Sequence, residues 1–383
     1  MEKNMTPLIR FRGFSEPWAT NELSDISTIN PKTEVPDTFE YVDLESVVGT
    51  SLLGHRTENK ETAPSRAQRL ASKGDIFYQT VRPYQKNNFL FDMEDRNYVF
   101  STGYAQIRAD ISSHFLFNVL QREPFLKEVL NNCTGTSFPA INANALGRID
   151  VSYPNDITEQ HKIGDTLTNL DSVLNFKSKE LEKLVNLKTA CMEKMFPQQG
   201  ETKPQLRFKG FNDEWNEVKL SDICSIQKGE QLNKSVLSET GDYYVLNGGI
   251  TPSGYTNSYN TEANTISISE GGNSCGYVNF NEEPFWSGGH NYTLTNLKNI
   301  DVLFLYQFLK CYEASIMAMR VGSGLPNIQK TRLMTFRIVF PSIAEQKKIG
   351  NYFCHLDELI AAKRQEIEKL QDIKQSLLDK MFV

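Results

Sequence analysis

Two stretches of the sequence are rich in side chains that hydrogen-bond to the edges of nucleic-acid bases. Arginine and lysine suit the paired acceptors of guanine, and asparagine and glutamine suit the donor and acceptor of adenine. In the first half of the chain we expect base contacts from Gln79, Arg82, Tyr84, Gln85, Lys86 and Asn87. In the second half we expect them from Asn273, Ser323, Asn327, Gln329, Lys330 and Arg332. For any single residue, simple exposure to solvent is the competing interpretation.

The local charge of these stretches favours a polyanionic partner, although the chain as a whole has a net charge of -6. Residues 56–86 contain seven basic and three acidic residues, and residues 320–337 contain four basic residues and no acidic one. Contacts to phosphate come from lysine and arginine. We therefore expect Arg56, Arg66 and Arg69 to position a phosphate backbone, with a solvated charged surface as the alternative.

The chain lacks the motifs that chemistry of its own on DNA would require. Adenine methylation needs a glycine-rich cofactor turn and an Asn/Asp-Pro-Pro-aromatic loop for the flipped base, and neither occurs. Residues 49–54 resemble a phosphate loop, but His55 and Arg56 follow where lysine and serine or threonine are required. The histidines and cysteines show no metal-ligand spacing. We expect no catalytic residue, metal or cofactor in this chain.

Composition predicts a folded cytoplasmic protein. Hydrophobic residues make up 39% and charged residues 23% of the chain, which is typical of soluble globular domains. We find neither a leader-like N-terminus nor an apolar stretch near the ~18 residues of a membrane span. The 383 residues indicate two or three domains at roughly 150 residues each.

The frame of the chain is duplicated. The opening Arg-Phe-Arg-Gly-Phe at residues 10–14, followed by Trp18 and Leu-Ser-Asp-Ile, recurs 197 residues later with lysine in place of the second arginine. The block Glu-Gln-x-x-Ile-Gly at 159–164 recurs 186 residues later, and the loop Gly-Thr-x-x-Pro-x-Ile at 135–141 recurs 187 residues later with serine in place of threonine. The middles barely correspond, as residues 82–88 and 270–276 illustrate. A repeated frame with divergent middles indicates two readers of two different targets.

Each closing block predicts a long helix. The patterns Asp156-x-x-Glu159 and Ser342-x-x-Glu345 are those of a capping box, and each follows a proline. Apolar residues then recur at three-four spacing in both segments, which is typical of a helix with one apolar seam. Lysines interrupt both seams at matching places, namely Lys177, Lys188, Lys363 and Lys374. We expect the two seams to pair with each other.

On these repeated blocks the chain resembles the specificity subunit of type I restriction–modification enzymes, over nearly its whole length. The resemblance implies two target-recognition domains that read two half-sites of double-stranded DNA, and an antiparallel helix pair with pseudo-two-fold symmetry. It also implies two methylase subunits and two restriction/translocase subunits as partners, and S-adenosylmethionine, ATP and Mg as cofactors of those partners. Residues 140–147 are richer in alanine and asparagine than 327–334, so base contacts are not transferred there.

The predicted fold class is α/β, with two recognition domains that are each followed by a long helix forming an antiparallel coiled coil. The expected boundaries are recognition domain 1 at 1–155, spacer helix 1 at 156–196, a linker at 197–204, recognition domain 2 at 205–341 and spacer helix 2 at 342–383. The expected function is that of a non-catalytic specificity subunit. The alternatives are a self-sufficient methylase or nuclease with its own recognition domains, and a structural coiled-coil scaffold.

Overall fold

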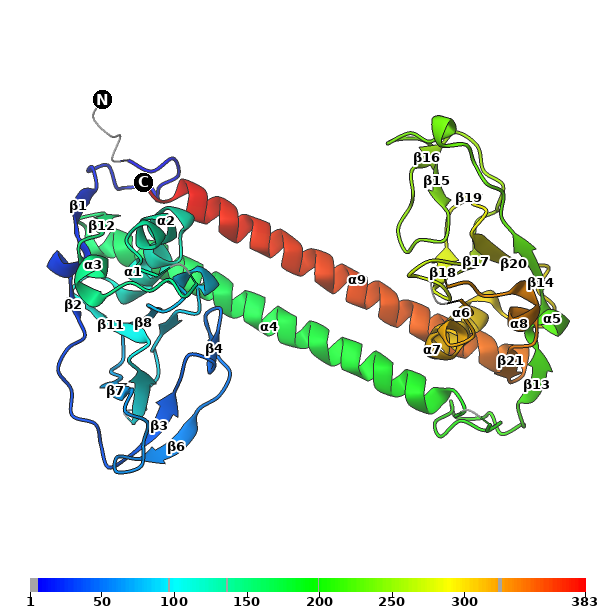
Figure 1. Cartoon of the computed structure of the whole chain (residues 1–383), viewed down its shortest axis with the longest axis horizontal. Helices are drawn as coiled ribbons and strands as arrows, with labels where there is room; N and C mark the ends of the chain where they lie inside the picture. The colour runs from blue at the N-terminus through cyan, green and yellow to red at the C-terminus, as the bar shows by residue number, and fades with distance from the viewer. Residues whose placement is uncertain (1–5, 96, 136, 199, 323–325) are drawn as a thin grey trace. The chain divides into compact units, whose positions relative to one another are not determined.

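The computed structural model describes residues 6–95, 97–135, 137–198, 200–322 and 326–383. The chain forms two compact units, shown in Figure 1, which we call unit 1 and unit 2. Unit 1 comprises residues Met1–Ser178 with Glu366–Val383, and unit 2 comprises Lys179–Gln365. Each unit contains one recognition module and parts of both long helices.

The centre of unit 1 is an antiparallel sheet of four strands. In order across the sheet these are β2 (Ser27–Ile29), β11 (Tyr104–Ala109), β8 (Asp75–Gln79) and β9 (Phe89–Leu90). Strand β8 is buried along its whole length. Its side chains alternate between two cores, since Ile76 and Tyr78 pack against the helices and Phe77 packs toward a second sheet.

That second sheet of unit 1 contains the strands β6 (Arg56–Asn59), β3 (Thr38–Val42), β10 (Tyr98–Ser101) and β7 (Ala67–Leu70), in this order. Strands β3 and β10 are parallel. The remaining strands are the hairpin β4 (Val47–Val48) with β5 (Ser51–Leu52), and the pair β1 (Ala19–Glu22) with β12 (Asp150–Tyr153). In Figure 1 the second sheet lies on the side of the central sheet that is remote from β1 and β12.

Short helices cover the other face of the central sheet of unit 1. They are α1 (Ser113–Leu120), α2 (Glu123–Asn131) and α3 (Ala143–Gly147), with the 3-10 turns η1 (Leu23–Asp25) and η2 (Pro83–Gln85). Helix α1 begins after Ser112, whose side chain accepts a hydrogen bond from the amide of Phe115. Phe115 packs edge to face on Trp18, so the opening block of the sequence completes this core.

Unit 2 repeats the central four-stranded sheet, but among its described residues the second sheet has three strands. Its central sheet contains β14 (Ser225–Lys228), β20 (Asn291–Thr295), β17 (Thr265–Ser269) and β18 (Val278–Asn281). Its other strands are β16 (Tyr255–Thr256), β15 (Tyr243–Leu246), β19 (Trp286–Ser287), β13 (Asn216–Lys219) and β21 (Arg337–Phe340). Its short helices are α5 (Leu220–Ile223), α6 (Val302–Cys311), α7 (Glu313–Met317) and α8 (Lys330–Met334), with the turn η3 (Lys234–Val236). The prediction of two α/β recognition domains is confirmed.

The two predicted long helices are α4 (Ile157–Met195) and α9 (Ile343–Lys380). The lysines that interrupt the seams all reach acidic residues on the opposite helix. In unit 1 the ion pairs are Asp171–Lys374 and Lys177–Glu366, and in unit 2 they are Glu180–Lys363 and Lys188–Asp357. Residue numbers rise along α4 as they fall along α9, so the helices pair antiparallel in each unit, as expected.

The predicted capping boxes do not form. Both carboxylate oxygens of Glu159 accept hydrogen bonds from Arg10, at 2.6 and 2.8 Å, and Glu345 is bound in the same way by Arg207 at 2.9 and 2.7 Å. Each glutamate side chain is fully buried. The repeated arginine and glutamate therefore join the opening block of each module to the start of its helix.

The glycine of the Glu-Gln-x-x-Ile-Gly block has a packing role. A Cβ at Gly164 would lie 2.5 Å from the amide nitrogen of Phe115, and one at Gly350 would lie 2.7 Å from that of Phe304. Side chains do not fit at such distances. Glycine thus allows α4 to pass closely over α1 and α9 to pass closely over α6. In the part of the chain that the structure describes, no helix combines the length and hydropathy that crossing a membrane requires.

Candidate nucleic-acid interface

The loop at 80–88 carries most of the predicted base contacts of unit 1. Two hydrogen bonds to Gln79, at the end of β8, hold this loop. The side-chain oxygen of Asn88 accepts from the backbone amide of Gln79 at 2.8 Å, and the side chain of Gln79 donates to Gln85 at 2.8 Å. Gln79 also donates to the carbonyl of Val81 at 2.7 Å. Gln79 is buried. It therefore supports the loop and does not present its amide to a base.

Two other predicted contact residues also fasten this loop. The ammonium of Lys86 donates to the carbonyl of Gln121 at 3.2 Å and pairs with Glu123 on α2. The side-chain oxygen of Asn87 accepts from the amide of Gly49 at 2.9 Å. The exposed side chains at the tip of the loop are those of Tyr84 and Gln85, and Arg82 is partly exposed beside them.

A second segment, residues 137–141 with Thr134, lies against the first loop. Ala140 forms β-bridges with both Val81 and Thr134. The amide of Arg82 donates to the carbonyl of Pro139 at 2.8 Å. The guanidinium of Arg82 lies over the ring of Phe138, with its carbon 4.5 Å from the ring centroid. Phe138 is not among the contacts predicted from the sequence, because the sequence motif at 135–141 indicated only that the frame is repeated.

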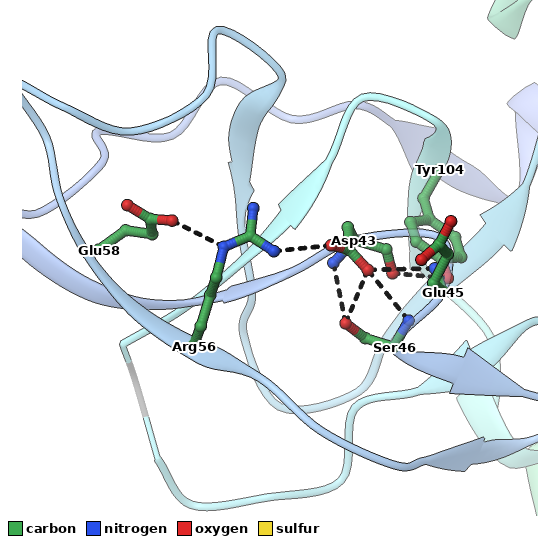
Figure 2. Close-up of polar contacts among 6 residues, drawn as sticks. All are labelled: Asp43, Glu45, Ser46, Arg56, Glu58 and Tyr104. Atoms are coloured by element: carbon green, nitrogen blue, oxygen red, sulfur yellow. Dashed lines mark hydrogen bonds and ion pairs between the residues drawn. The ribbon is translucent and has the colours of Figure 1, made fainter.

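Arg56 lies in an acidic environment at the edge of the second sheet, as Figure 2 shows. Its guanidinium donates to Asp43 at 2.8 Å and to Glu58 at 2.7 Å, and it lies over the ring of Tyr41. Burial tends to raise the pKa of Asp43, but hydrogen bonds from Ser46, Arg56 and the amide of Glu45 prevail, so that the pKa is lowered. These carboxylates reduce the charge that Arg56 offers to a phosphate.

The two other arginines expected at phosphates lie at β7. Arg66 is exposed just before this strand, and its carbonyl accepts from the amide of Thr102 at 2.8 Å. Arg69 lies on β7 and is half-buried, and burial lowers its pKa. Its Nε is buried and has no hydrogen-bond partner among the described residues. A buried N–H group without a partner costs free energy in the folded state.

The loop at 270–276 is the counterpart of the 80–88 loop in unit 2. Its base is Glu270, a nearly fully buried carboxylate at the end of β17. Glu270 accepts hydrogen bonds from Lys228 at 2.6 Å and from the Tyr292 hydroxyl at 2.9 Å, and Nδ1 of His290 lies 3.7 Å away. Burial would raise the pKa of Glu270, but the bonds from Lys228 and Tyr292 prevail and lower it. Glu270 is not among the site residues predicted from the sequence.

The predicted contacts of unit 2 occupy different positions around this loop. Asn273 is exposed at its tip, whereas Asn327 bridges Gly271 and Val321 through its backbone. Gln329, Lys330 and Arg332 are exposed at the start of α8, where the Arg332 guanidinium donates to the carbonyl of Met319 at 3.3 Å. Ser323 falls outside the described residues.

The two loop pairs share main-chain hydrogen bonds among their described residues. Gly272 donates to the carbonyl of Pro326 at 3.0 Å, as Arg82 does to Pro139. Ile328 donates to the carbonyl of Glu270 at 2.8 Å, as Ile141 does to Thr80 at 3.0 Å. The double bridge of Asn327 likewise repeats that of Ala140. The middles that barely match in sequence are therefore equivalent turns that carry different side chains.

Comparison with protein families identifies one domain in both halves of the chain. A family model described as the type I restriction modification DNA specificity domain matches residues 15–186 and 212–372. A Mycoplasma pneumoniae protein provisionally named a type I specificity subunit is 37% identical over 171 residues, which cover 42% of this chain and 44% of that protein. The chain thus matches about half the length of this curated relative.

A longer alignment and two solved structures agree with this match. The MjaVIII type I restriction enzyme specificity subunit of Methanocaldococcus jannaschii is 23% identical over 343 residues, covering 81% of this chain and 74% of that protein. The crystal structure of the type I restriction–modification S subunit from M. genitalium has a TM-score of 0.71 at 19% identity and covers 99% of both chains. A chain from a study of type I complex assembly has a TM-score of 0.51 at 22% identity, covering 95% of this chain and 97% of that one. These two structures share the fold.

Proposed function

The chain belongs to the family of type I restriction–modification DNA specificity subunits, and on this premise we propose that it reads a bipartite site in double-stranded DNA. The observation that carries the proposal is the pair of equivalent loops with unlike side chains. Base edges in the major groove are distinguished by side-chain donors and acceptors. One backbone frame that presents Arg82 and Tyr84 in unit 1, and Gly272 and Asn273 in unit 2, supports two different specificities.

The proposed contacts follow from the exposure and bonding of the predicted residues. The base-reading set is Arg82, Tyr84, Gln85, Asn273, Gln329, Lys330 and Arg332, and Ser323 stays in it as a sequence-based prediction. The supporting set, whose side chains or backbone fasten the loops, is Gln79, Lys86, Asn87 and Asn327. Arg66 and Arg69 contact phosphates, and Arg56 contributes less because Asp43 and Glu58 already bind its guanidinium.

The partners that we propose are two methylase subunits and two restriction/translocase subunits, which would supply S-adenosylmethionine, ATP and Mg chemistry. Exposed apolar residues recur at equivalent helix positions, Val173 and Ile373 in unit 1 and Leu187 and Leu359 in unit 2. In the register given by the ion pairs, Val173 on α4 lies opposite Ile373 on α9, and Leu187 lies opposite Leu359. Exposed apolar residues at equivalent positions of the two units suit two copies of one partner. Aspartate at Leu187 and Leu359 should reduce the methylase stoichiometry from two to one, measured by native mass.

The proposed domain division keeps recognition domain 1 at 1–155 and recognition domain 2 at 205–341, joined by helices at 156–196 and 342–383 and a linker at 197–204. Each domain should be exchangeable, because its loops are fastened by its own residues. Replacement of 27–155 by the equivalent segment of a relative should change one half of the methylated motif. A change in both halves would contradict the division.

We propose a cytoplasmic location, where such a complex meets DNA.

Methylation mapping tests the function directly. The chain is expressed with its methylase, and modified adenines are mapped across the genome. We expect a two-part motif with a fixed gap, and no methylation or cleavage by the purified chain alone with S-adenosylmethionine, ATP and Mg²⁺. Methyl transfer by the chain alone, with contaminating methylase excluded by mass spectrometry, would instead favour a self-sufficient enzyme. If the co-expressed pair methylated adenines without any common sequence motif, the specificity role would be contradicted.

A further inference from the structure

Two basic residues of the 80–88 loop occupy backbone conformations that unit 2 fills with glycine. Arg82 and Lys86 have φ of 55° and 54°, and the equivalent Gly272 and Gly276 have φ of 76° and 93°. This left-handed region is unfavourable for any residue with a Cβ. Such a conformation persists only where the surrounding structure holds it, and it is found most often at functional sites. Arg82 and Lys86 should therefore each have a specific role.

The two side chains differ in what they contact. The ammonium of Lys86 bonds to Gln121 and Glu123, so it has a structural role in fastening the loop to α2. The guanidinium of Arg82 forms no hydrogen bond or ion pair with any described residue. Its neighbour is the ring of Phe138, over which the guanidinium carbon lies at 4.5 Å. The ring thus covers one side of the cation, and its N–H groups are bonded to no described residue.

The ring of Phe138 is exposed on a backbone that is firmly held. Its side chain is 61% exposed. The next residue, Pro139, accepts the amide hydrogen of Arg82, and Ala140 is bridged on two sides. A fixed aromatic surface restricts the rotamers of the long arginine side chain that lies on it. Orientation of this kind is what bidentate recognition requires, because the fork of the guanidinium has to meet two acceptors at once.

We propose that Phe138 is a positioning residue that orients Arg82 for paired hydrogen bonds to O6 and N7 of a guanine in the first half-site. This inference rests on the proposed function and adds a base identity to it. Guanine presents these two acceptors together in the major groove, and arginine fits them bidentately. Unit 2 has Gly272 at the position of Arg82, so its half-site is read without this contact.

The test uses the full chain with its methylase and a duplex that contains the mapped site. Each guanine of the first half-site is replaced in turn by 7-deazaguanine, which lacks the N7 acceptor, and by inosine, which keeps N7 and O6. At one position 7-deazaguanine should weaken binding by the wild type about tenfold, and inosine should not. Binding by the Arg82→Gly and Phe138→Ala variants should show little dependence on N7 at that position.

Two matched variants separate orientation from folding. Arg82→Gly suits the left-handed backbone, so its melting temperature should equal or exceed that of the wild type although its guanine discrimination is lost. Phe138→Tyr keeps the aromatic face and should retain the dependence on N7, whereas Phe138→Leu should lose it. A purely structural role of Phe138 would lower the melting temperature and leave the base dependence unchanged.

The outcomes distinguish the inference from the proposed function. If the wild type binds its site specifically but no guanine of the first half-site separates it from Arg82→Gly, the inference is wrong and the specificity role stands. If the wild type binds no DNA sequence preferentially in the complex, the proposed function itself is wrong. A single guanine whose N7 dependence disappears in both Arg82→Gly and Phe138→Ala would establish the pair.

Discussion

The 80–88 loop of unit 1 and the 270–276 loop of unit 2 follow the same path but differ in nearly every side chain. Their shared hydrogen bonds are formed by main-chain groups, such as Arg82 to Pro139 and Gly272 to Pro326. Main-chain groups are present whatever residue occupies a position. A turn that is fixed in this way tolerates exchange of its side chains, which explains how one frame holds two unlike surfaces.

The supports beneath the two loops also differ. Unit 1 uses neutral amides, in which Gln79 bonds to Gln85 and Asn88. Unit 2 uses the carboxylate of Glu270, bound by Lys228 and Tyr292. Hydrogen bonds that involve a charged group are stronger and depend on protonation. The two modules should therefore respond equally to damage in the shared frame and differently to damage or acid beneath the loops.

The largest effects should come from the ion pairs that both modules share. Glu159→Ala leaves Arg10 without its partner, and Glu345→Ala does the same to Arg207. Loss of one member of a buried pair should cost about 3–5 kcal/mol of stability. Calorimetry should show a lower transition temperature for unit 1 in Glu159→Ala and for unit 2 in Glu345→Ala. A shift of the same transition by both variants would show that the units do not unfold separately.

Removal of the charge of Glu270 should affect unit 2 alone. Glu270→Gln should cost about 1–3 kcal/mol at neutral pH, because Lys228 loses its anionic partner. The pKa of Glu270 is lowered in the folded protein, so its contribution is present above its ordinary value of about 4.3 and disappears as the pH falls through the lower folded pKa. Lys228, Tyr292 and His290 face this carboxylate.

Thermal melting from about pH 7 down to about pH 3 checks this prediction. The difference in melting temperature between the wild type and Glu270→Gln should be largest at neutral pH and should decrease below about pH 4. The matched control is Gln79→Glu in unit 1, which places a carboxylate in the neutral support and should destabilise it most at high pH. A pH-independent difference for Glu270→Gln would mean that packing, and not charge, explains its effect.

The glycines of the 270–276 loop should differ in their tolerance of a side chain. A Cβ at Gly272 would meet nothing within 4 Å, whereas one at Gly276 would lie 2.8 Å from the Cα of Met317. Gly272→Ala should cost only the conformational penalty of the left-handed backbone, about 1–2 kcal/mol. Gly276→Ala should cost more because the backbone of α7 has to move. If urea unfolding showed equal losses of unfolding free energy for the two variants, α7 would have to shift at little energetic cost.

The smallest effects should come from the ion pairs between the long helices. Asp171→Asn and Asp357→Asn each remove one partner of a seam lysine, at equivalent positions of the two units. Partly exposed pairs contribute about 0–1 kcal/mol, so each variant should melt within a few degrees of the wild type. Sodium chloride at 1 M should reduce the difference further. A loss above about 2 kcal/mol would show that these lysines depend on their partners to remain in the seam.

Much of the fold could be predicted because it is repeated and periodic. The three-four spacing after Pro154 and Pro341 indicated both long helices. The helices begin at 157 and 343, within one residue of the expected starts at 156 and 342. The capping boxes were wrong because Glu159 is bound by Arg10, which is 149 residues away in the sequence. A local pattern contains no information about so distant a partner.

The binding loops were harder to predict for a related reason. Residue types identified Arg82 and Asn273 as candidate contacts, but they did not show that Gln79 is buried or that Lys86 is bonded to α2. The equivalence of the two loops was also missed, because a left-handed backbone accepts glycine in one copy and arginine or lysine in the other. Phe138 becomes a candidate only when its ring is found beneath a guanidinium.

The ends of the long helices have a consequence for synthesis on the ribosome. Phe196, just after α4, packs in the core of unit 2 on Phe304 and Phe353, whereas Phe382, just after α9, packs in the core of unit 1 on Trp18 and Phe115. The first module to be translated thus lacks part of its core until residue 382 emerges, and the second module completes its core earlier. Nascent chains that are stalled after residue 370 has emerged from the ribosomal tunnel should be protease-sensitive in the first module and protected in the second. The opposite pattern would mean that Phe382 is dispensable for closing the first core.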